Sequence, residues 1–194
     1  MTSSKLMEKL PKTEKLVEID SHCACAMSGI VGDARLLIDH ARVEAQNHTF
    51  NYAEPMDIEA ITQSVSDMGI NFGEGYEGSK KKAMSRPYGT GLLIGGVDSK
   101  GPQLYTFDPS GTYTEWQANA IGSGKETAMS TLKEQYHGSM TIEESKKLIL
   151  QTIKNVMEEK ISADNVEVMI IRADTRKVSS MQPDEVNALI ETLA

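Results

Sequence analysis

The run of residues 91–97 (GLLIGGV) limits the possible folds of this chain more than any other segment. It carries no charged or strongly polar side chain, so a strand formed there must be covered on both faces. Segments with helical spacing occur in pairs before and after it, and the other strand-like segments follow one another closely. This order predicts an α+β fold with sheets stacked face to face and helices outside, not alternating βαβ units.

Further strands are predicted on both sides of this run. Residues 15–20 and 23–27 are short strand-like segments separated by Ser21 and His22, which indicates a tight hairpin. Residues 103–107 follow a Gly-Pro turn, and the Asp-Pro-Ser-Gly sequence at 108–111 is a strong turn. We expect residues 112–120 to form the next strand.

Two helices are predicted before the apolar run. The first has its apolar face at positions with helical spacing: Ala34, Leu37, Ile38, Ala41 and Ala45. Asp57 is the predicted N-cap of the second helix. The apolar face of that helix comprises Ile58, Ile61, Val65 and Met68.

The C-terminal half is predicted to add three helices and two strands. Residues 125–136 form one helix, and Thr141 with Glu144 is a capping box at the start of another. We expect that helix to bury Ile149, Ile153 and Val156. Residues 166–171 and 177–181 are predicted to pair as strands. A last helix begins near Pro183, which suits a first helical turn.

Composition excludes several classes of function. The 194 residues carry a net charge of −8, with the acids dispersed, so a nucleic-acid partner is not expected. No apolar run approaches the ~20 residues that span a bilayer, so no membrane partner is expected either. Two cysteines do not make a disulfide framework, which favours a reducing intracellular compartment.

Three motifs that carry chemistry elsewhere are weak here. Cys23 and Cys25 are too close together for a structural zinc site, so neither a metal nor a cofactor is expected. The sequence GSGK at 122–125 lacks the first glycine and the Ser or Thr of a phosphate-binding loop. Thr2, exposed by removal of Met1, would be an N-terminal nucleophile only at the mouth of a buried strand, and charged residues follow it.

Several segments, in order, resemble the proteasome α-subunit family. They are residues 13–20 (TEKLVEID), 27–35 (MSGIVGDAR), 86–89 (RPYG), 108–111 (DPSG) and 120–124 (AIGSG). Residues 63–67, 72–75, 84–87 and 156–160 are most similar to the eukaryotic α5-type members. The resemblance extends from about residue 5 to residue 193.

The resemblance implies a single α-type domain over residues 1–194 with a four-layer αββα sandwich, the fold of N-terminal nucleophile hydrolases. It also implies a non-catalytic place in a heteroheptameric α ring, which caps the β rings and docks activators, in the cytoplasm and nucleus. Members of the family begin with several dozen residues that come before the part similar to this chain. We therefore expect the first strands to be missing, and some sheet edges to be unpaired.

One binding site is implied by the same resemblance. Lys15 corresponds to the lysine that pairs with the C-terminal carboxylate of an activator tail, and Gly29 lines the same pocket. An ammonium group captures a carboxylate through a charge-assisted hydrogen bond, and a glycine lets a peptide backbone approach. Two other functions stay open at this point: a threonine hydrolase that uses Thr2, and a stand-alone binding protein of the same fold.

Overall fold

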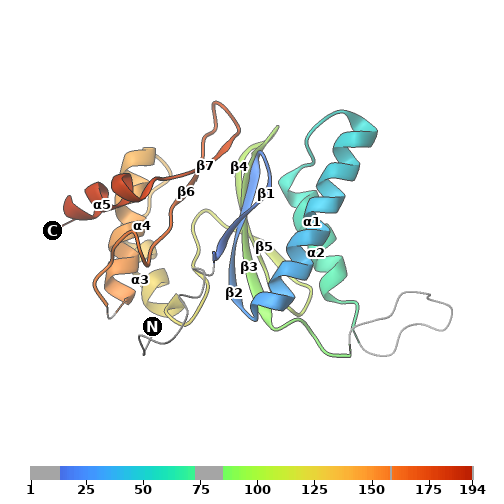
Figure 1. The fold of residues 1–194 in the computed structure, drawn as a ribbon, viewed down its shortest axis with the longest axis horizontal. Helices are drawn as coiled ribbons and strands as arrows, with labels where there is room; N and C mark the ends of the chain where they lie inside the picture. Colours follow the sequence, from blue (N-terminus) through green and yellow to red (C-terminus); the bar gives the residue numbers. More distant parts are fainter. Residues whose placement is uncertain (1–13, 73–84, 158, 194) are drawn as a thin grey trace, which may run out of the picture.

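The computed structural model describes residues 14–72, 85–157 and 159–193, and these form four layers (Figure 1). Thr2 lies outside the described residues. Two helices cover one face of a five-stranded sheet, and a two-stranded ribbon with three helices lies against the other face. The elements are β1 (Leu16–Asp20), β2 (Cys23–Gly29), α1 (Val31–Tyr52), α2 (Ile58–Gly69), β3 (Thr90–Asp98), β4 (Gly101–Phe107), β5 (Tyr113–Glu115), α3 (Lys125–Gln135), α4 (Ile142–Val156), β6 (Met169–Ile171), β7 (Val178–Ser180) and α5 (Pro183–Glu191). The predicted αββα sandwich is confirmed.

The large sheet is antiparallel throughout, in the order β1-β2-β3-β4-β5. The predicted hairpin is confirmed, because β1 and β2 pair with Val17 opposite Cys25. Strand β3 lies between β2 and β4, and Leu92 and Ile94 are completely buried. The apolar run therefore occupies the centre of the sheet, as its composition requires.

The predicted strand at 112–120 is wrong in length. Of this segment, only Tyr113–Glu115 (β5) pairs with β4, although the Trp116 N–H still donates to the Leu104 carbonyl at 2.8 Å. Further along, the Asn119 side chain accepts the N–H of Ala120 at 2.7 Å. A local side-chain bond of this kind is an alternative to a ladder bond for that N–H.

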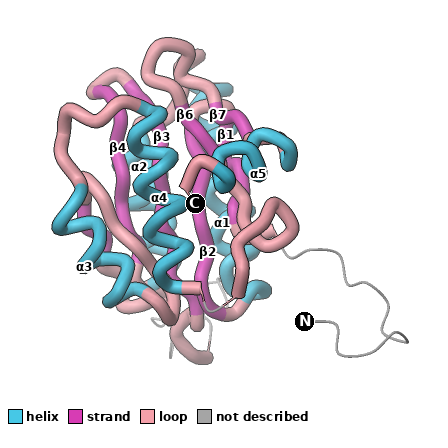
Figure 2. Tube along the Cα trace, turned by 90° about the vertical axis from the view of Figure 1, so that its left-hand side faces the viewer, coloured by secondary structure: helices cyan, strands magenta, loops and turns pink. Residues whose placement is uncertain are grey.

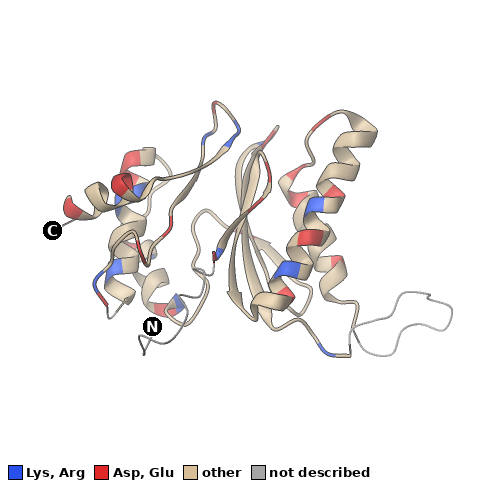
Figure 3. Cartoon of the chain, viewed as in Figure 1, with Lys and Arg blue, Asp and Glu red and all other residues tan. Residues whose placement is uncertain are grey.

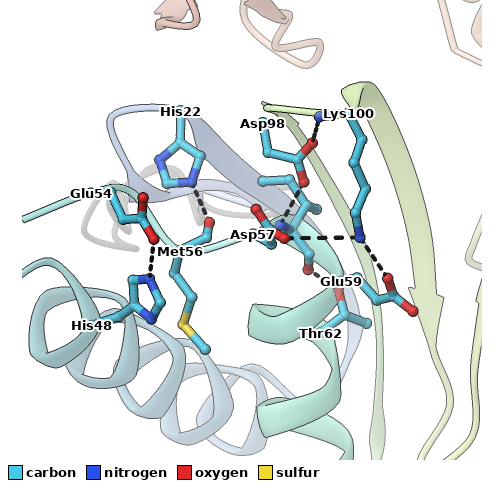
Figure 4. A network of polar contacts seen from close by, with 10 residues as sticks. His22, His48, Glu54, Met56, Asp57, Glu59, Thr62, Asp98 and Lys100 are labelled. Carbon is cyan, nitrogen blue, oxygen red and sulfur yellow. Dashed lines mark hydrogen bonds and ion pairs between the residues drawn. The ribbon is translucent and has the colours of Figure 1, made fainter. Parts of the chain in front are cut away.

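Helix α1 packs against the sheet through the predicted face, whose five residues are all buried. The face of α2 is also confirmed for Ile58, Ile61 and Val65. Asp57 is the N-cap residue, but its side chain makes no capping bond. Instead Asp98, at the end of β3, accepts the Ile58 N–H at 3.1 Å (Figure 4). The capping acid comes from the sheet because a residue distant in sequence can supply the same acceptor.

Helix α4 begins with the predicted capping box, since the Glu144 N–H donates to the Thr141 hydroxyl and the Thr141 N–H to the Glu144 carboxylate. Its predicted apolar face is wrong at Ile149, which is 48% exposed. The buried positions of α4 are Leu148, Leu150 and Thr152. They lie on two flanks, because α4 packs against α3 on one side and contributes Leu150 to a second core on the other.

The C-terminal elements form that second core in front of the sheet (Figure 2). Strands β6 and β7 pair as predicted, although β6 begins at Met169 and not at residue 166. Pro183 lies in the first turn of α5, also as predicted. The second core contains Leu150, Ile161, Val166, Val168 and Val186. Within the described ranges, no helix is both long and apolar enough to cross a membrane.

Candidate functional site

Lys15 is exposed and immediately precedes β1, which is an edge strand of the large sheet. Its carbonyl accepts the N–H of Met27 at 2.9 Å, one residue beyond the pair of Leu16 with Ala26. Strand β2 ends two residues after Met27, at Gly29. The structure thus brings the two predicted site residues to the same end of the β1–β2 hairpin.

Gly29 occupies a corner that excludes every other residue type. Its φ is +112°, a conformation that side chains rarely adopt. A Cβ atom added there would lie 2.3 Å from the Gly89 carbonyl oxygen and 2.9 Å from the Thr90 Cα. The glycine therefore has a structural reason to be present, apart from any contact with a ligand.

Helix α1 begins beside this corner, with Ile30 as its N-cap. Ile30 makes no side-chain capping bond, and a Cβ on Gly32 would meet no atom within 4 Å. The first N–H groups of a helix have no intrahelical partner, and they carry the positive end of the helix dipole. An exposed N-terminus of this kind favours a carboxylate ligand.

An ion pair with a buried carboxylate and a half-exposed arginine lies just inside the first turn of α1. The Asp33 carboxylate, 6% exposed, accepts hydrogen bonds from Arg86 at 2.6 and 2.9 Å and from the Gly89 N–H at 2.7 Å. The hydrogen bonds from Arg86, and then the one from Gly89, hold the pKa of Asp33 below its usual value. The pKa of Arg86 is raised by the same pair. Both groups are therefore charged near neutral pH.

The cysteines and the buried histidine are not arranged as a catalytic or metal site. Burial raises the pKa of the Cys25 thiol to about 12, and burial also raises the pKa of Cys23. The ring of His22 is 3% exposed, and its Nε2 lies 2.8 Å from the Met56 carbonyl oxygen (Figure 4). Among the described residues there is no group of three His, Cys, Asp or Glu side chains that could hold a metal ion.

Charges of both signs are interspersed on the outer helices (Figure 3). Along α1, for example, Asp39 and Arg42 form an exposed pair one turn apart, with 3.5 Å between Oδ1 and Nη1. Phosphate binding needs clustered basic residues, and the described outer helices carry mixed charges instead.

Sequence reasoning missed the part that Asp33 and Arg86 play near the site. The sequence indicates Asp33 only as an acid near the start of a helix, and Arg86 only as part of the RPYG segment. Fifty-three positions separate the two residues, and the contact depends on how β3 begins beside α1. No local spacing rule predicts such a contact.

The comparisons with known proteins agree with the fold. Residues 1–171 match the family described as "Proteasome subunit". The chain is 51% identical over 180 residues to "Proteasome subunit alpha type-5" of Dictyostelium discoideum, which covers 93% of this chain and 74% of that protein. It is 47% identical to the protein of the same name from Trypanosoma brucei brucei, covering 93% and 72%. Identity to the Drosophila melanogaster protein is 44%, covering 95% and 76%.

Proposed function

This chain belongs to the proteasome subunit family, and we propose that it acts in the heteroheptameric α ring of the core particle and docks activator tails there. It is a non-catalytic subunit of the α type-5 kind, which supports protein degradation by assembling with other proteasome subunits. The similarity over 93% of the chain carries this conclusion. It favours a ring subunit over the hydrolase that uses Thr2 and over a stand-alone binding protein.

The outer face of α1 supports assembly with neighbouring subunits. Leu36, Val43 and Phe50 recur every seven residues, and are 50%, 55% and 90% exposed. Residues seven apart lie on one side of a helix, so these side chains form an apolar stripe. An exposed apolar face of a helix is a surface that another protein can cover. We propose that the partners are other α subunits and β-ring subunits, in the cytoplasm and nucleus.

The proposed tail pocket is supported by three features at one end of the hairpin. Lys15 supplies an exposed ammonium group. Helix α1 begins directly after Gly29, and its N-terminus has no side-chain cap. Gly29 leaves the corner between them without a side chain. A terminal carboxylate is bound best by charge-assisted hydrogen bonds from such donors. We infer that Lys15 binds the carboxylate of an activator tail.

Native mass analysis of the tagged chain, purified from its own cells, tests the assembly. We expect a stacked-ring particle of several hundred kilodaltons, with other α and β subunits. A chain that travels alone, or as a small homo-oligomer, would contradict the ring proposal.

The variant Lys15→Ala tests the pocket. We expect binding of a carboxyl-terminal activator peptide to weaken by about tenfold or more, since the lost charge-assisted bond contributes about 1.5–3 kcal/mol. Fluorescence anisotropy of a labelled peptide measures this change, and native mass should show unchanged assembly. The matched control is Lys133→Ala, an exposed lysine of α3. Equal affinity of Lys15→Ala and wild type would refute the assignment.

A further inference from the structure

The backbone corner at Gly29 and Ile30 is positioned by hydrogen bonds to residues 89 and 90, which do not belong to the β1–β2 hairpin. The Ile30 N–H donates to the Gly89 carbonyl at 2.8 Å. The Thr90 hydroxyl donates to the Ser28 carbonyl at 2.9 Å, and Gly29 pairs with Thr90. The position of this corner therefore depends on where residues 89 and 90 lie.

Residues 89 and 90 are in turn positioned by Asp33. One carboxylate oxygen of Asp33 accepts both the Gly89 N–H and one Arg86 nitrogen, while the other oxygen accepts the second Arg86 nitrogen. Arg86 also donates to the Pro87 carbonyl at 2.9 Å, so its guanidinium joins Asp33 of α1 to the segment that leads into Gly89. A buried carboxylate with three donors is costly to disturb, because each donor removed leaves part of the charge less well compensated.

The backbone at the corner is closely packed. A Cβ on Gly29 would lie 2.3 Å from the Gly89 carbonyl oxygen. The end of β2 therefore approaches the residue before β3 through a glycine. If residues 86–89 shift, the Ile30 N–H loses its acceptor and the corner moves with them.

We propose that Asp33 and Arg86 are positioning residues for the tail pocket. The ion pair between them fixes the backbone corner at Gly29, at the same end of the hairpin as Lys15. The proposal rests on the proposed function of Lys15 and Gly29. Asp33 and Arg86 need not touch the tail. They act by holding Gly89, which holds Ile30 at the start of α1.

The test compares Arg86→Gln with Arg86→Lys in the full chain, in the assembly in which it is purified. The probe is a fluorescein-labelled heptapeptide copied from the C-terminus of an activator, with an amidated copy as reference. We expect Arg86→Gln to weaken binding of the free-carboxylate peptide about tenfold, which corresponds to about 1.4 kcal/mol. Arg86→Lys keeps one charge-assisted bond to Asp33, so we expect it to restore about half of that loss on the free-energy scale.

A matched control exists elsewhere in the chain. Arg172 also forms a bidentate pair, with Asp174, at 3.1 Å for each bond. The two arginines are similarly exposed, but the Asp174 side chain is 62% exposed whereas that of Asp33 is 8% exposed. Arg172→Gln removes the same charge and should leave peptide binding unchanged. The amide resonance of Ile30 should move in Arg86→Gln and return toward its wild-type position in Arg86→Lys, since it reports the bond to Gly89.

The outcomes separate the two proposals. If Lys15→Ala has no effect on binding, the pocket itself is refuted. If Lys15→Ala weakens binding while Arg86→Gln behaves like Arg172→Gln, the pocket stands and the positioning role is overturned. If Arg86→Gln weakens binding of the amidated and the free peptide equally, or if Arg86→Lys restores nothing, the role is also overturned. If a thermal melt shows that Arg86→Gln is unfolded, binding of the free-carboxylate peptide is compared between Arg86→Lys and wild type instead. Arg86→Lys must then bind the peptide more weakly than wild type, and equal binding overturns the positioning role.

Discussion

The two cores of this molecule differ in how completely they exclude water. In the first, between the large sheet and α1 and α2, many side chains are fully buried, Leu37, Ile58 and Ile94 among them. In the second, around α4, α5, β6 and β7, only Leu150 is fully buried, and the other members are 2–9% exposed. The first core has five paired strands behind it, whereas the second has two strands of three residues.

This difference indicates that the two cores contribute unequally to stability. Two-stranded ribbons are marginally stable alone, and a fold opens first where apolar contacts are fewest. The ribbon is tied to the large sheet by the Val178 N–H, which donates to the Ser21 carbonyl at 2.8 Å. We therefore expect the second core to open locally while the first stays closed.

The largest expected effect comes from truncating the centre of each core. We expect Ile94→Ala to lower the free energy of unfolding by about 4 kcal/mol and Leu150→Ala by about 3 kcal/mol, because the weaker core relaxes around its cavity more easily. Urea unfolding measures both.

Hydrogen exchange sharpens the same comparison. Leu150→Ala should speed exchange in α5, β6 and β7 and leave β2 and β3 protected, whereas Ile94→Ala should affect both regions. If Leu150→Ala lowers protection in β3 by as much as in β6, the two cores unfold as one unit and do not differ in local stability.

The next largest effect is expected at Asp33, in the first region. Asp33→Asn should lower the free energy of unfolding by about 2 kcal/mol near neutral pH, since the charged bonds to Arg86 are weakened. The pKa of Asp33 is lower in the folded chain than its ordinary value, so this stability is present above the ordinary value. It is lost as pH falls through the folded pKa.

Urea unfolding of the wild type and Asp33→Asn between pH 7 and pH 2.5 tests this sign. The difference between the two proteins should be constant near neutrality and shrink only under acidic conditions. A difference that grows on acidification would contradict the assigned direction of the pKa shift.

The smallest effect is expected for the matching ion pair of the second region. Arg172 and Asp174 also make two bonds, but water screens both exposed groups. Arg172→Gln should therefore leave the free energy of unfolding nearly unchanged, as is typical for exposed pairs. A cost equal to that of Asp33→Asn would show that burial does not separate the two pairs.

Local patterns predicted most of the elements and one core. The hairpin, the central strand, the buried face of α1 and the capping box at Thr141 follow from spacing within a few residues. The predictions failed where another part of the chain intervened. Ile149 is exposed because α4 is covered on two flanks, and Asp57 does not cap α2 because Asp98 does.

Some residues of the candidate site could likewise be predicted from the sequence, and others only from the structure. Lys15 and Gly29 could be named from a resemblance in sequence, and the structure places them at one end of the hairpin. The pair of Asp33 and Arg86 could not be found in that way, because the residues are far apart in sequence and meet only where β3 starts beside α1.

The sequence by itself determined the helices, the antiparallel hairpins and the family, because these depend on periodicity and on residue types at short spacing. Only the tertiary structure decided which acid caps α2, which flanks of α4 are buried and which arginine holds the corner at Gly29. Those contacts join segments distant in the chain, so their energies depend on burial and geometry that exist only after the layers have packed.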